Sequence, residues 1–164
     1  MGQLRRAVML IAATLVFASP CAAKVVKFEI VKVESPAFEG RTFGAVGTYD
    51  RILARAAIAV TPDDPNNKII VDLDRAPRNA QGQIEAVTDV EILRPTVAAN
   101  GNRTLFYDVL NRGSKLGLAL FNDIPAVTND LVKAADAGNG FLMRSGTRWF
   151  GAAGKATSCR AAAA

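Results

Sequence analysis

Hydrophobic and polar residues alternate along much of the first two thirds of the chain, and this pattern predicts β-strands. Val26, Phe28 and Ile30 are separated by charged residues, which is the period-two pattern of a half-buried strand. Further strands are predicted at 49–60, where 54–57 would also suit a helix, at 69–71 as a short buried strand, and at 84–93 and 104–110. Because polar turns at 61–67 and 100–102 join these strands, we expect a mostly antiparallel opening sheet with a hairpin turn before residue 104.

Helical patterns follow only after residue 113. Ser114 is expected to cap a short helix over 116–121, whose leucines and phenylalanine we interpret as core residues. Another turn or two is expected at 131–135, and a third helical segment at 139–145 with Phe141 and Leu142 facing inward. Strands followed by helices are typical of the first half of an α/β domain rather than of a finished β-sandwich. The predicted fold class is therefore α/β.

Residues 1–23 have the pattern of a secretory signal peptide. The basic pair Arg5-Arg6 precedes an apolar run, and small residues lead up to a cleavage site after Ala23. The run is too short to span a bilayer as a helix, which argues against an uncleaved anchor. Cys21 could indicate a lipoprotein, although Pro20 fits that motif poorly, and the choice between general and twin-arginine export stays open. The predicted location is the periplasm or the medium, with no stable membrane anchor after cleavage.

The net charge of +5 does not belong to the body of the chain. The chain has 20 Lys and Arg against 15 Asp and Glu, but two cations lie in the leader and three after residue 145. Residues 24–145 are therefore neutral, and nucleic acid is not an expected partner. The sequence contains no histidine, so no Ser-His-Asp triad and no histidine-based metal site can form within it. No cofactor or metal is predicted.

Five segments carry a resemblance to a known family. They read ESPAFEGRTFGAVGTYDR at 34–51, IIVDLDRAPRNAQGQIE at 69–85, LFYDVLNRG at 105–113, ALFND at 119–123 and AGNGFLMRSG at 137–146. Together they resemble the N-terminal part of a bacterial family described as alpha/beta hydrolase domain-containing proteins. The resemblance implies that 24–145 is the strand-rich N-terminal portion of an α/β-hydrolase fold. It also implies esterase-like, cofactor-free acyl hydrolysis of a small ester-like substrate by the full-length protein, whose nucleophile elbow lies downstream of this region.

The composition changes at Gly146, where an alanine-rich tail with three cations and no anion begins. The family would be expected to continue here with a strand resembling GYxVVWSGWQGDV. Codons that encode Thr147 to Cys159 can be chosen so that a neighbouring frame reads YAVVWSGWQGDVL. We therefore hypothesise that a frameshift near Ser145–Gly146 truncated a longer hydrolase and that 146–164 is out of frame; a natural alanine-rich tail is the alternative.

No catalytic residue is predicted, because none of the serines after the leader lies in a G-x-S-x-G elbow. The loop of Asn111, Arg112 and Gly113 follows a strand, as oxyanion loops do in α/β-hydrolases, so it is a candidate oxyanion loop; a simple turn is the alternative. The aspartates within 63–74 do not have EF-hand spacing, and we interpret them as loop acids or as partners of Arg75 and Arg78.

Two functions are compatible with these observations. The first is an exported N-terminal fragment of a serine-type hydrolase, inactive alone because the elbow and the histidine are absent. The second is a small, complete periplasmic β-rich binding or interaction module without catalysis.

Overall fold

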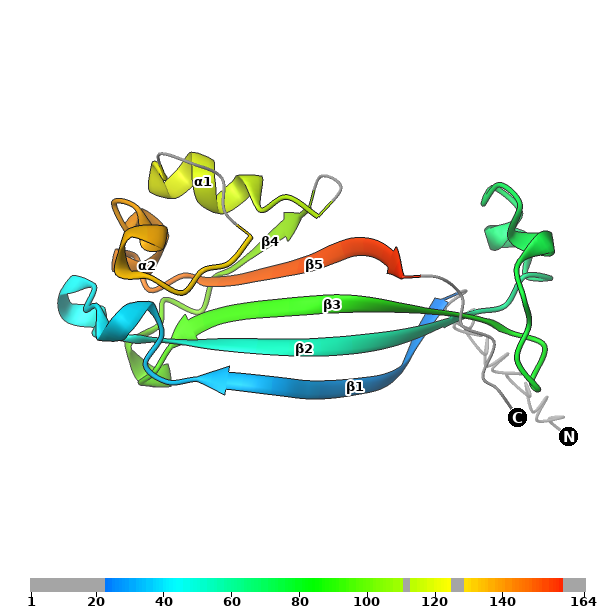
Figure 1. Ribbon diagram of the computed structural model, residues 1–164, viewed down its shortest axis with the longest axis horizontal. Coiled ribbons are helices and arrows are strands. Elements are labelled where there is room, and N and C mark those ends of the chain that lie inside the picture. Colours follow the sequence, from blue (N-terminus) through cyan, green and yellow to red (C-terminus); the bar gives the residue numbers. More distant parts are fainter. Residues whose placement is uncertain (1–22, 111–112, 125–128, 158–164) are drawn as a thin grey trace, which may run out of the picture.

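The computed structural model describes residues 23–110, 113–124 and 129–157, the last five of them as backbone only. Its strands are β1 (Ala23–Glu34), β2 (Tyr49–Val60), β3 (Ile84–Pro95), β4 (Leu105–Val109) and β5 (Arg148–Thr157), and its α-helices are α1 (Leu116–Asn122) and α2 (Phe141–Arg144) (Figure 1). Short 3-10 turns lie in several of the connecting segments. Most of the predicted leader lies outside the described residues, but Ala23, after which cleavage is predicted, is the first residue of β1.

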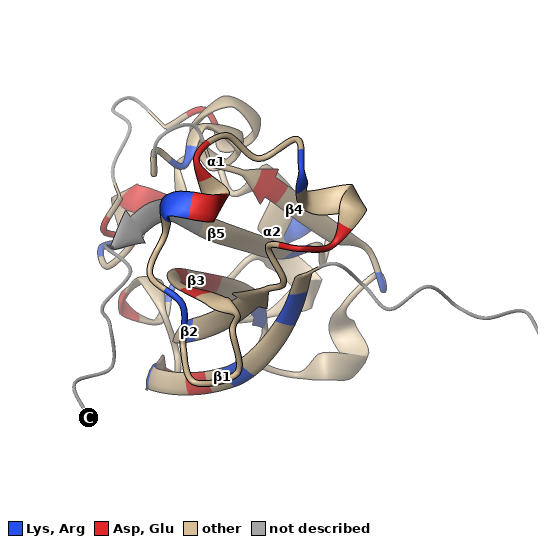
Figure 2. Cartoon of the chain, turned by 90° about the vertical axis from the view of Figure 1, so that its right-hand side faces the viewer, with Lys and Arg blue, Asp and Glu red and all other residues tan. Residues whose placement is uncertain are grey.

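The described strands form one mixed sheet in the order β1-β2-β3-β5-β4. The first four strands in this order pair antiparallel, whereas β4 runs parallel to β5. The strands lie one above another from β4 at one edge to β1 at the other (Figure 2). β5, the last strand in the sequence, therefore lies inside the sheet between two earlier strands.

The predicted α/β class, and with it the α/β-hydrolase fold, is wrong for this chain. In an α/β fold, helices cover the faces of the sheet. Here α1 has seven residues and α2 four, so α1 is about 10 Å long, against about 40 Å for each twelve-residue strand. The helices lie at one end of the sheet, near the start of β2 (Figure 1). The chain is instead strand-rich, with a sheet that its helices cover only in part.

Several local predictions also fail. Residues 69–71 are not a buried strand: they lie in a series of turns, and Ile69 is 86% exposed. A short apolar run does not by itself define a strand, because it needs a neighbour with which to pair. Residues 100–102 are not a hairpin turn, since β5 separates β3 from β4. Lys115 rather than Ser114 is the N-cap residue of α1, and its own side chain makes no capping hydrogen bond.

The main core lies under α1 and α2, on one face of the sheet. The register places Leu93 of β3, Trp149 of β5 and Phe106 of β4 side by side on this face. Leu118 from α1 and Leu142 from α2 pack into the same cluster. Phe141 and two α1 residues, Leu120 and Phe121, are instead exposed, so their predicted inward orientation is wrong.

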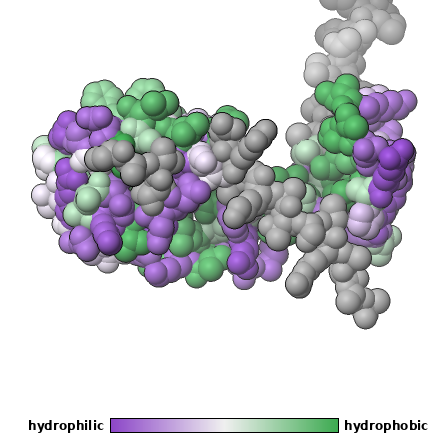
Figure 3. Space-filling model, turned by 45° about the horizontal axis from the view of Figure 1, so that its top comes forward, coloured by the Kyte–Doolittle hydropathy of each residue, from purple (hydrophilic) through white to green (hydrophobic). Residues whose placement is uncertain are grey.

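Apolar side chains also form rows on the opposite face of the sheet. One row runs from Val33 through Ile52, Ile92 and Phe150 to Tyr107, and the next from Ile30 through Ala54, Val90 and Ala152 to Val109. The central members of these rows are buried or half-buried, whereas the members on the edge strands β1 and β4 are exposed. Hydrophobic side chains also reach the surface at the helix-bearing end and on the projecting 61–83 segment (Figure 3).

Tyr49 connects the start of β2 with α2 and with the segment that follows α2. Its ring is fully buried against Phe43, with centroids 5.5 Å apart, and its hydroxyl donates to Met143 O at 3.1 Å or to Thr147 O at 3.0 Å. Burial raises the pKa of Tyr49 to about 12, although Arg148 nearby acts in the opposite direction. The neutral phenol is therefore favoured in the folded state.

This pKa predicts a loss of stability at alkaline pH. Because the folded state holds the Tyr49 proton more tightly than the unfolded chain, the contribution is complete below pH 10 and is lost as the pH rises from 10 to 12. We expect the loss to reach about 2–3 kcal/mol. Urea unfolding at pH 9 to 12 measures it, with Tyr49→Phe as the control. If the Tyr49→Phe variant lost stability as steeply as the wild type over this pH range, the alkaline loss would not come from Tyr49.

Candidate functional site

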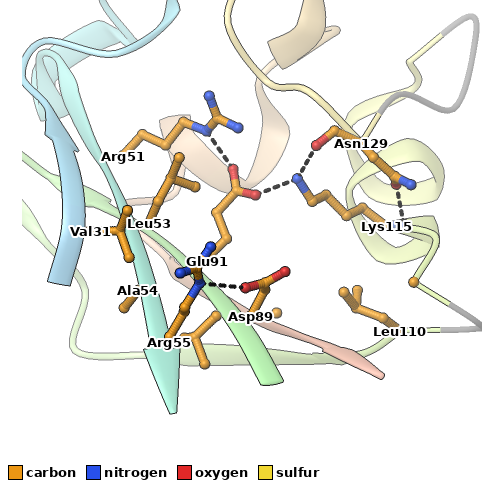
Figure 4. Close-up of a pocket in the computed structure, with 13 residues that line it drawn as sticks. Val31, Arg51, Leu53, Ala54, Arg55, Asp89, Glu91, Leu110, Lys115 and Asn129 are labelled. Atoms are coloured by element: carbon orange, nitrogen blue, oxygen red, sulfur yellow. Dashed lines mark hydrogen bonds and ion pairs between the residues drawn. The ribbon is translucent and has the colours of Figure 1, made fainter. Parts of the chain in front are cut away.

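A layer of buried charged side chains lies next to the main core. Arg51 of β2, Glu91 of β3 and Lys115 before α1 have side chains only 5–8% exposed. Arg51 Nε donates to Glu91 Oε1 at 2.6 Å, and Lys115 Nζ donates to Glu91 Oε2 (Figure 4). Glu91 thus joins two cations that come from elements far apart in the sequence.

The register of the sheet places this layer. Arg51 lies directly opposite Leu93, and Glu91 directly opposite Leu53, so all four side chains are on the face that carries the main core. Charged residues therefore occupy inward positions in strands that otherwise alternate normally. Buried charges are stable only when they are paired and hydrogen-bonded, and here each of the three buried charges has an ionic partner.

Arg51 is surrounded by carboxylates. Besides Glu91, it contacts Glu34 of β1 at 3.2 Å and Asp130 at 3.3 Å, and the Asp130 side chain is 79% exposed. Burial alone would lower the pKa of Arg51, but the hydrogen bond that Arg51 donates to Glu91 and the charges of the nearby carboxylates outweigh burial and raise the pKa. The pKa of Glu34 is lowered, mainly by its hydrogen bond from Lys32, with Arg51 adding to the effect. Both groups are charged at neutral pH.

A cavity of about 320 Å³ opens beside this layer (Figure 4). Charged and polar groups at one side of it include Glu91, Lys115 and Asn129, and Arg55 and Asp89 form a second ion pair at 3.4 Å. The rest of the lining is mainly apolar or backbone: Val31, Leu53, Ala54, Val90, Leu110, Gly113 and Gly151, with Arg51 completing the set. The cavity can thus hold a small molecule that has both an apolar and a charged part.

The predicted oxyanion loop is only partly within the described residues. Asn111 and Arg112 lie outside them, whereas Gly113 is described, is buried and lines the cavity. Its φ of +87° is in the region that favours glycine, and a Cβ added there would meet no atom within 4 Å. The oxyanion role stays a prediction, and its one described residue adjoins the cavity.

The sequence-based interpretation of the loop aspartates fits the structure. The loop aspartates do pair with the expected arginines: Asp63 with Arg78 at 3.1 Å and Asp72 with Arg75 at 3.2 Å. Among the residues that the structure describes, no group of three or more histidine, cysteine, aspartate or glutamate side chains is placed to hold a metal ion. The 138–140 segment is a helix-entry turn, in which Asn139 Oδ1 accepts from Phe141 N at 2.9 Å.

Sequence reasoning missed Arg51, Glu91 and Lys115 altogether. The available signal was the alternation itself, because Arg51 falls between Tyr49 and Leu53 at an inward position of β2. The described lining of the cavity contains no serine, threonine or cysteine nucleophile. The paired charges and the cavity beside them can bind and orient a ligand that carries a charged group.

Comparison with known proteins gives no identification. Neither family models, nor curated proteins, nor solved structures gave a match to this chain. Within the part of the chain that the structure describes, none of the helices has the length and apolar character required to cross a membrane.

Proposed function

We propose that this chain is the N-terminal, sheet-forming part of a longer exported hydrolase, delivered to the periplasm or the medium, and that it does not hydrolyse acyl bonds on its own. The observation that carries this proposal is the edge of the sheet at β4. Among the described residues β4 pairs with β5 only, so its other side offers unpaired backbone groups. Side chains on one face of β4 fit the same account, because the two apolar rows end there at Tyr107 and Val109, and Val109 is 78% exposed.

Edge strands of finished sheets are normally protected. Proline, lysine or a bulge in the strand usually prevents further pairing. The sequence of β4, LFYDV, contains none of these protective residues, and its one charge, Asp108, is buried and accepts a hydrogen bond from Gly117 N at 3.0 Å. The parallel pairing of β4 with β5 also suits extension, because parallel strands are usually continued through crossover segments. Further strands of a longer protein would cover this edge.

The lack of activity follows from composition. Acyl hydrolysis by a serine triad requires a histidine to accept the serine proton, and the sequence has none. The resemblance of 34–146 to the hydrolase family supplies the proposed reaction class and a small ester-like substrate for the longer protein. No cofactor is part of this proposal.

Sequencing the gene around the codons for Ser145 and Gly146, and several hundred nucleotides downstream, tests the proposal. We expect the neighbouring frame to encode the WSGWQGD continuation, then a serine elbow, an acidic residue and a histidine. Restoring that frame should produce hydrolysis of p-nitrophenyl acetate that the 164-residue chain lacks. A downstream region without an elbow and a histidine in any frame would contradict the proposal.

The cavity beside Glu91 favours a second candidate, a small binding module that acts without catalysis. A binding module would be monodisperse, would unfold in one cooperative transition and would bind little of a dye that reports exposed apolar surface. The sheet-forming part of a larger protein should instead bind such a dye strongly, because its apolar rows reach the surface at β1 and β4. Thermal unfolding with and without the dye distinguishes the two candidates.

A further inference from the structure

Lys115 has a hydrogen-bond donor left over. An ammonium group carries three N–H donors. In the described part of the chain, Lys115 Nζ bonds to two acceptors, Glu91 Oε2 and Asn129 O. The Lys115 side chain is 8% exposed, and it is one of the residues that line the cavity (Figure 4). A buried charged donor without an acceptor is costly, so an oxygen atom of a ligand in the cavity would find a favourable partner here.

The charges around Lys115 favour an anion over a cation. The three buried side chains, Arg51, Glu91 and Lys115, sum to one positive charge. Glu34 and Asp130 together more than offset this charge, but both contact Arg51 rather than Lys115. The carboxylate of Glu91 is engaged on both oxygens, by Arg51 and Lys115, and is not available to a cationic ligand. Of the buried charged groups that line the cavity, Lys115 therefore offers a cationic donor.

The apolar wall indicates the rest of the ligand. Val31, Leu53 and Leu110 face the cavity in Figure 4, and Gly113 and Gly151 add no side chain to fill it. The volume of about 320 Å³ is at the lower end of the range for small-molecule sites, roughly 300–1,000 Å³. A ligand that fits has a short apolar chain and one anionic end.

We propose that this cavity binds a small monocarboxylate, with its carboxylate on Lys115 Nζ and its aliphatic chain against Leu53 and Leu110. Charge-assisted hydrogen bonds to a carboxylate are among the stronger polar contacts in proteins, and a partly dry site strengthens them further. The site does not depend on the hydrolase proposal, because every residue in it belongs to the described chain.

Isothermal titration of the whole chain with hexanoate, hexanamide and hexylamine tests the chemistry. These probes share an aliphatic chain of similar length and differ in the charge of the head group. We expect hexanoate to bind, hexanamide to bind at least tenfold more weakly, and hexylamine to give no measurable heat. Equal affinity for hexanoate and hexanamide, preference for the amine, or no binding of hexanoate at millimolar concentration would each overturn the proposal.

Two variants locate the site. Lys115→Met nearly keeps the length of the side chain but removes the donor, and it should weaken hexanoate binding at least tenfold. The control is Lys68→Met, at an exposed lysine of the 61–83 segment, which should leave hexanoate binding unchanged. Leu53→Trp fills the cavity without altering any charge and should also abolish binding, so the test holds even if Lys115→Met fails to fold. Wild-type affinity in a folded Lys115→Met or Leu53→Trp variant would refute the site.

Discussion

Replacement of Trp149 by alanine is expected to lower the free energy of unfolding by about 3–5 kcal/mol, enough to unfold a domain of ordinary stability. Trp149 is 1% exposed and lies in the middle of the main core, directly beside Leu93 of β3 and Phe106 of β4. Removal of the indole ring leaves a large cavity in the core beside β3 and β4, the two strands with which β5 pairs. Because the chain has one tryptophan, urea unfolding should be followed by circular dichroism rather than by fluorescence.

Trp149→Phe is the matched variant. The indole Nε1 is buried and has no hydrogen-bond partner in the described structure, so phenylalanine removes an unsatisfied donor along with part of the ring. Its loss of stability should be clearly smaller than that of the alanine variant. Phe121→Ala, at a half-exposed aromatic residue of α1, provides a surface control that should cost less than either. If Trp149→Ala cost no more than Phe121→Ala, Trp149 would not be a core residue and the placement of β5 would be wrong.

Glu91→Gln is expected to destabilise the fold by about 3–5 kcal/mol, because it removes the shared anion and leaves two cations buried without adequate compensation. Glutamine has nearly the same shape, so no cavity is created and the loss measures charge. Denaturant unfolding at neutral pH provides the measurement.

Asp89→Asn is the control for Glu91→Gln. Asp89 lies two residues away on the same strand and face and also pairs with an arginine, but both partners of that pair are largely exposed. Its replacement should therefore change stability by less than about 1 kcal/mol. Equal effects of the two substitutions would show that burial does not distinguish these ion pairs.

The positions of most strands could be predicted because alternation directly reflects which side chains face inward. The 49–60 segment, whose alanines also suit a helix, is a strand because it pairs along its whole length with β3 and over 51–60 with β1. β5 was not predicted, since its sequence, RWFGAAGKAT, is rich in glycine and alanine and weak in strand propensity. Its position between β3 and β4, where both of its edges find hydrogen-bond partners, outweighs that weakness.

The candidate site was less accessible to sequence reasoning than the strands. Arg51 and Glu91 are 40 residues apart and are brought together by the register of β2 and β3. Lys115, 24 residues after Glu91, reaches them from the residue before α1. No local motif marks such a cluster. Charged residues at inward positions of an alternating strand are the sequence feature that indicates such a cluster.

The central position of β5 imposes an order on folding. Among the described residues, β3 and β4 have no direct pairing, and both depend on a strand that is synthesised after them. A nascent chain that has reached only residue 145 can form the β1-β2-β3 meander, but β4 then has no strand beside it. Contacts between segments so far apart in sequence also form slowly. The described sheet is therefore completed only after synthesis has passed residue 157, and until then β4 lacks the one described strand with which it pairs.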